Sequence, residues 1–351
     1  MFIPRPEGGL SLDTVDRELL NIVQSRFPVE SRPYLNLGEE VGITEMEAYQ
    51  CVQEMRAQGY IRRLGGILDS HRLGYYSTLC AAKVPEEKIP VLTEILAGIT
   101  GVTHNYLRAH TYNMWFTLIA PSYPEVEEIL NRVKTQSGVE EIYSLPALRL
   151  YKINVDFDFN TNNKIPDNED HTSDNLNSRH QNMKQRGADS LLKQPYAVSE
   201  EEIALIRLLQ EDLPDGLNPF RTLATELGWE ENMVLEYTHR LLEEGVIRRL
   251  GAVLRHQKAG FVANAMGVWQ VESERAAEVG PLMASFREVS HCYERPTLPD
   301  WPYNLFPMVH GHSEQECRQV IAKIAHTTGI TKYDALYSLL ELKKSSMKYF
   351  V

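Results

Sequence analysis

Hydrophobic and polar positions follow one pattern twice along the chain. A segment of helical period, in which apolar residues recur every three or four positions, opens each half at 13–24 and 199–210. Asp13 and Ser199 stand just before these apolar runs and are expected to be N-caps. Each half therefore begins with an amphipathic helix.

Two more helices are predicted after each opening helix. A loop containing prolines leads to a short helix that ends at Gly42 or Gly228, and a longer helix follows at 44–58 or 230–244. This order is typical of a winged helix-turn-helix, whose wing would start in the run Arg-Arg-Leu-Gly. The predicted winged-helix domains are 10–75 and 197–261.

Apolar strands and two helices then alternate in the order β-α-β-β-α-β, which is the pattern of a ferredoxin-like domain. The expected strands are 76–84, 102–108, 112–119 and 139–150, then 262–271, 288–295, 303–310 and 330–342. The expected helices are 86–96, 123–135, 273–285 and 313–327. The predicted ferredoxin-like domains are 76–158 and 262–351.

The two halves are an internal duplication. The run at 59–68 recurs at 245–254, and the register holds without gaps back to Leu12 and Val198. Between them, 159–196 is rich in Asn, Asp, Ser, Lys and Gln, which predicts a flexible linker long enough for the halves to meet face to face. The fold class is therefore α+β: a duplicated winged helix-turn-helix plus ferredoxin-like domain, arranged as an intramolecular pseudo-dimer.

The charge changes the expected partners of the winged helices. The formal net charge is -12, and the third helices are acidic where a DNA-reading helix would carry Arg, Lys, Asn or Gln. We expect the shape to be retained and nucleic-acid binding to be lost. The sequence shows no signal-peptide pattern and no apolar stretch of membrane-spanning length, so we expect a cytoplasmic protein that does not enter membranes.

The four cysteines, Cys51, Cys80, Cys292 and Cys317, form no C-x-x-C pair. This spacing does not indicate a zinc site or an iron–sulfur cluster. We expect reduced, buried thiols. Cys292 adjoins His291, but alternation along a strand places it on the opposite face, in a packing position.

The candidate chemistry lies in two matching strands, His-Asn-Tyr-Leu-Arg at 104–108 and His-Cys-Tyr-Glu-Arg at 291–295. Side chains of a strand alternate between its faces, so each strand presents His, Tyr and Arg together. One copy alone would suit an exposed sheet face with a solvated Arg. The repetition favours a functional site made of His104, Tyr106, Arg108, His291, Tyr293 and Arg295.

Cations are concentrated near the start of each wing. Arg62 and Arg63 in the first half match Arg248 and Arg249 in the second, and further basic residues follow each pair. Guanidinium groups bind carboxylates in a bidentate manner, so the cluster suits a ligand with several carboxylates. The alternative is that one Arg of each pair packs against the acidic third helix.

The motifs at 62–77, 104–108 and 112–116, with their counterparts at 248–261, 291–295 and 303–306, resemble those of the sirohaem decarboxylases. These enzymes are related to the leucine-responsive (AsnC) feast/famine regulators. The resemblance covers nearly the whole chain outside the linker. It implies two fused subunits that remove the C12 and C18 acetate carboxyls of sirohaem, giving 12,18-didecarboxysirohaem for haem synthesis by the alternative pathway or for the haem of a nitrite reductase.

The resemblance also implies roles for residues. His104 and His291 would deliver protons, and Tyr106 and Tyr293 would orient them or relay a proton. The residues expected to bind the substrate are Arg62, Arg63, Arg248, Arg249, Arg255, His256, Lys258, Tyr112, Asn113, Trp115, Tyr303 and Asn304. No cofactor is expected beyond the iron that arrives with the tetrapyrrole, and a homodimer is left open.

Several alternatives stay open at this point. His104 or His291 could instead be an axial ligand of the iron. Second-tier histidines are His71, His110, His256, His310 and His312, of which His256 is favoured by its basic surroundings. The turn at 109–111 lengthens to 296–302 in the second half, so one composite site competes with two equivalent ones. A ligand-sensing regulator and a non-catalytic tetrapyrrole carrier are the competing functions.

Overall fold

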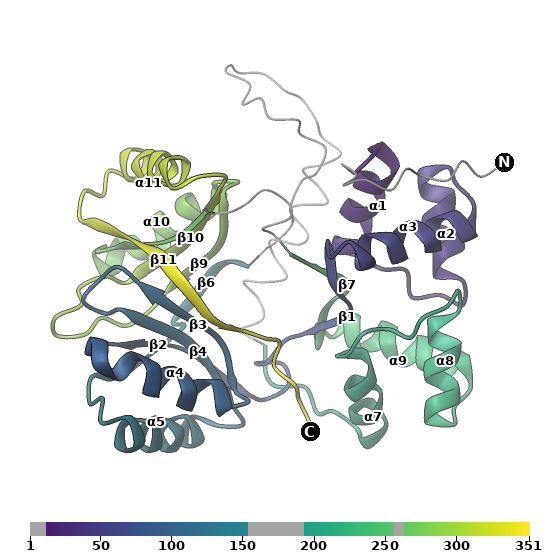
Figure 1. The fold of residues 1–351 in the computed structure, drawn as a ribbon, viewed down its shortest axis with the longest axis horizontal. Coiled ribbons are helices and arrows are strands. Elements are labelled where there is room, and N and C mark those ends of the chain that lie inside the picture. The colour runs from purple at the N-terminus through teal and green to yellow at the C-terminus, as the bar shows by residue number, and fades with distance from the viewer. Residues whose placement is uncertain (1–11, 154–192, 256–262) are drawn as a thin grey trace.

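The helix-turn-helix segments of both halves lie together in one lobe, on the right in Figure 1. The computed structural model describes residues 12–153, 193–255 and 263–351. The predicted linker 159–196 therefore lies mostly outside the described residues. The helices of this lobe are α1 (Thr14–Ser25), α2 (Pro33–Val41), α3 (Glu45–Ala57), α7 (Glu200–Leu209), α8 (Pro219–Leu227) and α9 (Glu231–Glu243).

Local signals set the ends of these helices. Asp13 and Ser199 cap α1 and α7, each in a reciprocal capping box, as predicted. Gly42 and Gly228 end α2 and α8 with φ of 77° and 69°. This left-handed conformation is costly for residues with a Cβ, which explains why the short helices stop at glycine.

The strands predicted to start two separate wings pair with each other instead. β1 (Ile61–Leu68) and β7 (Ile247–Leu254) form an antiparallel two-stranded sheet across the halves, with Gly65 opposite Gly251. A Cβ on Gly65 would lie 2.2 Å from the Glu211 oxygen. Glycine thus lets each strand approach the end of the first helix of the other half.

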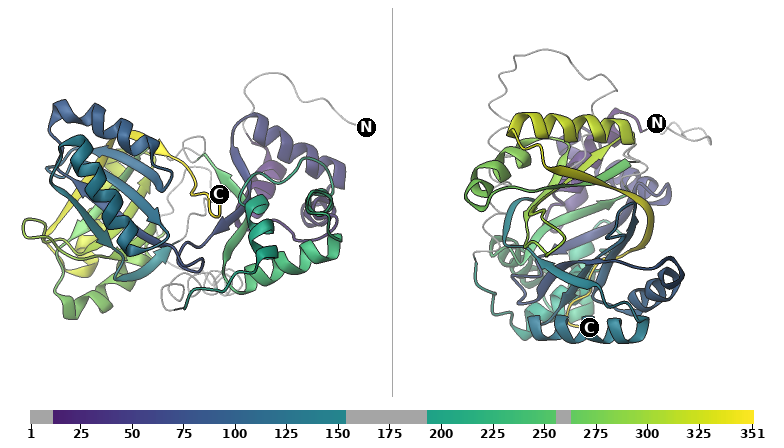
Figure 2. Two further views of the ribbon diagram at one scale, coloured as in Figure 1. Left: turned by 90° about the horizontal axis from the view of Figure 1, so that it is seen from below. Right: turned by 90° about the vertical axis from the view of Figure 1, so that its left-hand side faces the viewer.

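The second lobe is a nine-stranded sheet among the described residues, in the order β5-β2-β4-β3-β11-β8-β10-β9-β6. Its strands are β2 (Tyr76–Ala82), β3 (Val102–Arg108), β4 (Met114–Ala120), β5 (Ile142–Pro146), β6 (Arg149–Ile153), β8 (Ala263–Trp269), β9 (Val289–Glu294), β10 (Leu305–Gly311) and β11 (Tyr333–Lys344). The 3-10 turn η1 (Glu86–Lys88) precedes α4. Helices cover the outside of the sheet (Figure 2), namely α4 (Ile89–Gly98), α5 (Tyr123–Ser137), α10 (Ser273–Ser285) and α11 (Glu314–Thr328).

The halves exchange their last strands, which confirms the predicted pseudo-dimer. The prediction of one strand at 139–150 is wrong, because the chain breaks after Pro146. β5 pairs with β2 of its own half, whereas β6 pairs with β9 of the other half. In the second half one long strand does both: β11 pairs first with β8 and then with β3.

The interior between the two sheet halves is aromatic. Trp115 and Phe306 meet Trp301, which comes from the longer second-half turn and is 1% exposed. The four cysteines are buried and free, and Cys292 packs in the core under the helices, both as predicted. No helix of the described residues is long and apolar enough to span a bilayer.

Candidate active site

A β-bulge precedes the first-half histidine. The pairing of β3 with β4 moves from Val102 opposite Leu118 to His104 opposite Thr117, so Thr103 is the extra residue. A bulge changes the direction of the side chains at that point and is common next to active sites. Here it brings the Thr103 hydroxyl to 3.0 Å from Nδ1 of His104.

The second half repeats this geometry. β9 moves from Val289 opposite Val309 to His291 opposite Met308, which leaves Ser290 as the extra residue. The Ser290 hydroxyl lies 2.8 Å from Nδ1 of His291. A hydroxyl therefore fixes the same ring nitrogen of both histidines.

A third imidazole joins the second-half arrangement. Nε2 of His310 lies 2.8 Å from the Ser290 hydroxyl. His310 stands two residues after Met308 on β10, and the corresponding first-half residue, two after Thr117, is Ile119. A bulge leaves no local signal in the sequence, so the contact with Ser290 could not be foreseen. His310 is for this reason only a second-tier candidate in the sequence.

The environment keeps His291 neutral. Burial lowers its pKa to about 3, and the charges of His310, Arg248 and His104 act in the same direction. His104 acts in the same direction although it comes from the other half. We use the name histidine cluster for the imidazoles that belong to the two bulges, His104, His291 and His310.

Alternation places each His, Tyr and Arg on one face, as predicted. The rings of His104 and Tyr106 are stacked with centroids 6.4 Å apart, and those of His291 and Tyr293 are 6.2 Å apart. The hydroxyl of Tyr106 donates a hydrogen bond to Glu341, 3.0 Å away on β11.

Arg108 and Arg295 are on this face but lie deep inside the protein. They are 2% and 9% exposed, and burial lowers the pKa of each to about 10. Each donates a hydrogen bond of 2.6 Å to a main-chain oxygen of the other half, Leu336 for Arg108 and Leu145 for Arg295. These bonds give both arginines a structural role, and their expected part in catalysis stays a prediction.

The paired arginines near the wings divide into two roles. Arg63 donates to the main-chain oxygen of Gln210 at 2.5 Å, and Arg249 donates to that of Gln24. These oxygens end the first helix of the opposite half, where the helix dipole is negative. One Arg of each pair is therefore structural, as the alternative held, but its partner is not the third helix.

The first Arg of each pair contacts a polar side chain instead of a helix end. Arg62 makes a 3.4 Å hydrogen bond to Ser346, and its charge opposes the rise that burial causes in the pKa of Tyr106. Arg248 lies 3.5 Å from the Asp69 carboxylate and acts on the pKa of His291. Their part in substrate binding stays a prediction.

Lys344 is a cation that sequence reasoning missed. Cross-strand pairing sets it opposite His104, and its ammonium lies 3.6 Å from the Glu341 carboxylate. Burial lowers its pKa. Its position depends on β11 crossing into the other half, which no local pattern predicts.

Five aromatic and amide residues expected to bind substrate make packing contacts, and their part in substrate binding stays a prediction. The side-chain amide of Asn113 accepts a hydrogen bond from the main-chain N–H of Val84 and donates one to its oxygen. The amide of Asn304 makes the same two hydrogen bonds with Val271. Tyr112 and Trp115 are 1% exposed, and Tyr303 packs on Trp301.

The remaining predicted residues are only partly placed. Arg255 is exposed at the end of β7, where its main-chain N–H bonds Tyr60. His256 and Lys258 lie outside the described residues. In the part of the chain that the structure describes, no three His, Cys, Asp or Glu side chains gather as a metal site.

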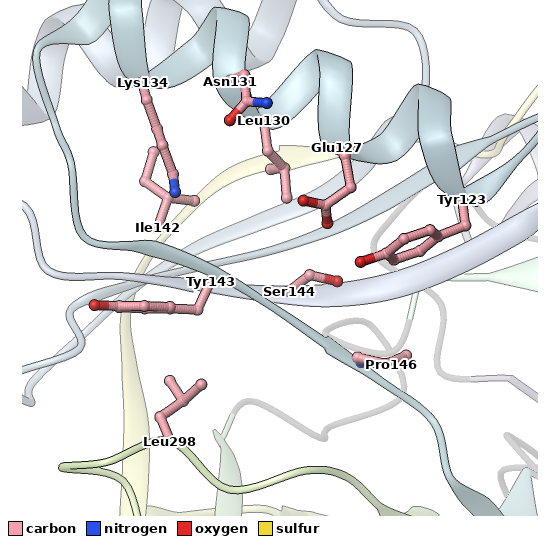
Figure 3. Close-up of a pocket in the computed structure, with 10 residues that line it drawn as sticks. All are labelled: Tyr123, Glu127, Leu130, Asn131, Lys134, Ile142, Tyr143, Ser144, Pro146 and Leu298. Carbon is pink, nitrogen blue, oxygen red and sulfur yellow. The ribbon is translucent and has the colours of Figure 1, made fainter.

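A hollow of about 240 Å³ lies elsewhere, between α5 and β5 (Figure 3). Lys134, Tyr143 and Leu298 are among the residues that line it, and none of the histidine cluster does. Its volume is below the roughly 300–1,000 Å³ of typical ligand pockets. The hollow is therefore separate from the candidate active site.

Comparison with known proteins identifies the family. A sirohaem decarboxylase of Hydrogenobacter thermophilus is 34% identical over 334 residues, which cover 95% of this chain and 94% of that protein. The chain belongs to the sirohaem decarboxylase family. The family's NirDL-like helix-turn-helix domain matches residues 16–62 and 202–248, and an AsnC-like ligand binding domain matches 72–152 and 258–343.

Two further sirohaem decarboxylases show how the halves relate to known forms. The alpha subunit from Nitratidesulfovibrio vulgaris is 51% identical over 146 residues, 42% of this chain and 82% of that subunit. The crystal structure of the sirohaem decarboxylase NirDL with an iron-uroporphyrin III analogue matches with a TM-score of 0.71 and 31% identity, over 96% of this chain and 95% of that one. The fold is thus that of a duplicated decarboxylase with two domain types.

Proposed function

We propose that this protein is a cytoplasmic carboxy-lyase that removes the C12 and C18 acetate carboxyls of sirohaem. The products would be 12,18-didecarboxysirohaem and two molecules of carbon dioxide, on a route to haem by the alternative pathway or to the haem of a nitrite reductase. Family membership supports this, as does the iron-uroporphyrin analogue bound by the related NirDL structure.

One observation carries the proposal. His104 and His291 follow matching bulges in β3 and β9, and each has a cation nearby: Lys344 stands opposite His104 on β11, and the charge of Arg248 lowers the pKa of His291. A regulator needs no pair of imidazoles beside cations. An enzyme that must bind carboxylates and deliver protons does.

The residues divide the work between binding and proton delivery. Arg62, Arg248 and Lys344 would hold the carboxylates that stay on the tetrapyrrole and so fix which acetate faces an imidazole. The tetrapyrrole itself accepts the electron pair left when carbon dioxide departs. An imidazole of His104 or His291 then supplies the proton that completes the methyl group.

Each histidine strand pairs with a strand of the other half, β3 with β11 and β9 with β6, so each histidine lies where the two halves meet. The iron arrives with the substrate, and we expect no other cofactor. If the protein ligates that iron, the ligand would be His104 or His291, each of which has a hydroxyl on Nδ1.

The test is anaerobic incubation of the purified protein with sirohaem, followed by mass spectrometry of the tetrapyrrole. The expected product is lighter by two carbon dioxides. A Soret change on binding without any change in mass would instead indicate a carrier, and an unchanged substrate would refute the activity.

A DNA-binding regulator is the competing function, because the AsnC-like domain is present. The start of α3 argues against it: Glu45 is paired with Arg32, and Glu47 closes the capping box with Thr44. Carboxylates at this end would repel phosphates. A mobility-shift assay at low salt that found specific DNA binding would restore the regulator.

A further inference from the structure

The second half contains a continuous hydrogen-bonded chain that the proposed chemistry has not yet used. Nδ1 of His291, the hydroxyl of Ser290 and Nε2 of His310 are joined by two contacts of 2.8 Å. A serine hydroxyl can donate one hydrogen bond while accepting another. The chain can therefore carry a proton in one direction without any change of side-chain position.

The hydroxyl of the chain is buried, and the imidazoles at its two ends are half-buried. Ser290 is 8% exposed, whereas His291 and His310 both have intermediate exposure. His310 is the next-to-last residue of β10, and its main-chain N–H donates to the oxygen of Glu288. The next residue but one, His312, is exposed. His310 thus lies between the buried Ser290 and the protein surface.

The first half lacks this connection. Thr103 supplies the equivalent hydroxyl to His104, but Ile119 stands where the second half has His310. A side chain of Ile can neither donate nor accept a proton. The two halves therefore share the bulge and its hydroxyl, and they differ in whether an imidazole contacts that hydroxyl.

We propose that Ser290 and His310 form a proton relay that resupplies His291 during decarboxylation, which makes the second-half imidazole the principal proton donor. This inference rests on the proposed function, because it assigns the proton source for that reaction. Ser290 and His310 act through His291 and are positioning and relay residues, not groups that touch the substrate.

Atoms and charge balance in this step. The bond between the acetate carbon and its carboxyl breaks, carbon dioxide leaves, and the electron pair remains with the tetrapyrrole. Nε2–H of His291 breaks as the new C–H bond forms. Nδ1 of His291 takes the Ser290 hydroxyl proton, the hydroxyl takes the Nε2 proton of His310, and solvent gives a proton to Nδ1 of His310. Both rings then return to their starting tautomers by proton exchange with solvent before the next carbon dioxide leaves. One proton is consumed for each carbon dioxide.

The surroundings make such a relay useful. His291 faces other cations or imidazoles, namely His104, His310, Arg248 and Arg295, and burial lowers its pKa, so it is neutral at pH 7. A neutral imidazole that gives up Nε2–H would become an anion unless Nδ1 gained a proton in the same event. The hydroxyl of Ser290 is placed to supply that proton.

The residues at the matching positions of the first half suggest which substitutions test the relay. His310→Ile and Ser290→Thr each install the residue that the first half has at the matching position, and Ser290→Ala removes the hydroxyl. We expect His310→Ile and Ser290→Ala to lower kcat with sirohaem by about tenfold to a hundredfold, within the range of general acid–base effects. KM and the Soret titration should stay unchanged.

Three further measurements separate a relay from a packing effect. Ser290→Thr should retain most of kcat, since its hydroxyl remains. Added imidazole should restore part of the kcat of His310→Ala, and the wild-type solvent deuterium isotope effect should change in His310→Ile. His312→Ala is the matched control, because this exposed imidazole is two residues away, and it should behave as wild type.

The outcomes are distinct. Wild-type kcat in folded His310→Ile and Ser290→Ala, with turnover by the wild type, would overturn the relay and leave the decarboxylase standing. Absence of wild-type turnover would overturn both. If either variant fails to fold, imidazole rescue of His310→Ala and the activity of Ser290→Thr decide the question, and failure of both would refute the relay.

Discussion

The guanidinium of Arg108 donates a hydrogen bond to the main-chain oxygen of Leu336, 2.6 Å away in the other half of the molecule. Arg295 makes the corresponding bond to Leu145. Both arginines sit beside functional histidines in sequence, yet they hold the two sheet halves together. Their role is therefore to be tested through stability.

Arg108→Met should lower the free energy of unfolding by about 1.5–3 kcal/mol, because a buried hydrogen bond from a charged group is lost. KM for sirohaem should hardly change. Urea denaturation and steady-state kinetics check this. Arg26→Met is the matched control: its ion pair with Glu40 is exposed, and exposed pairs contribute less than about 1 kcal/mol. A raised KM with unchanged stability would return Arg108 to the substrate site.

Neighbouring arginines should respond in opposite ways. Arg62→Ala removes a cation that acts on Tyr106, which shares a strand face with His104, so KM should rise about tenfold or more while stability changes by under about 0.5 kcal/mol. Arg63→Ala removes the bonds to Gln210 and Glu211 and should cost about 1.5–3 kcal/mol of stability with KM near that of the wild type. Equal kinetic effects would contradict the division of roles.

Gly251→Ala should destabilise the protein by about 1–3 kcal/mol, the usual cost of overpacking. The added methyl group would lie 2.6 Å from the main-chain oxygen of Val23 in the other half, which cannot move freely. Gly98→Ala is the control, since nothing lies within 4 Å of its Cβ position. Thermal denaturation of both variants measures the difference, and similar melting temperatures would show that β1 and β7 are less closely packed.

The neutral His291 predicts a loss of stability in mild acid. Its ordinary pKa is 6.5 and its folded pKa is about 3, so below pH 6.5 the unfolded chain binds a proton that the folded protein does not. The free energy of unfolding should therefore fall as the pH falls through this window, by at most about 1.4 kcal/mol per unit from this residue. Above pH 6.5 the contribution is constant.

Urea denaturation at about pH 7.5 and about pH 5.5 checks this expectation against His291→Asn, in which the titrating ring is gone. The wild type should lose more stability than the variant over this range. Equal losses would mean that His291 takes up a proton in the folded state, and the relay would then be unnecessary.

Features with a local cause could be predicted from the sequence. The caps at Asp13 and Ser199, and the helix ends at Gly42 and Gly228, each depend on residues a few positions apart. The face shared by His, Tyr and Arg follows from the two-residue repeat of a strand. These expectations needed no knowledge of which strands pair.

Features that depend on pairing between distant strands could not be predicted. The break between β5 and β6 reflects a choice between two partner strands, one in each half. Lys344 stands opposite His104 only because β11 pairs with β3 of the other half. His310 meets Ser290 only because a bulge turns both towards each other. None of these relationships has a signature in nearby residues.

Separate halves should be soluble only together. Expressed alone, residues 1–175 would leave β6 without β9, and residues 176–351 would leave half of β11 without β3. Unpaired strands of this kind promote aggregation. Co-expression should yield a one-to-one complex by size-exclusion chromatography, and a stable, monomeric single half would contradict the exchange.

The exchange of β6 and β11 also bears on how such an enzyme can evolve. When two identical chains trade strands, every mutation appears on both sides of the assembly. A single polypeptide that trades strands with itself always contains one of each side, so a change can be selected on one side alone. His310 in the second half, where the first half has Ile119, is a difference of the kind that this arrangement permits.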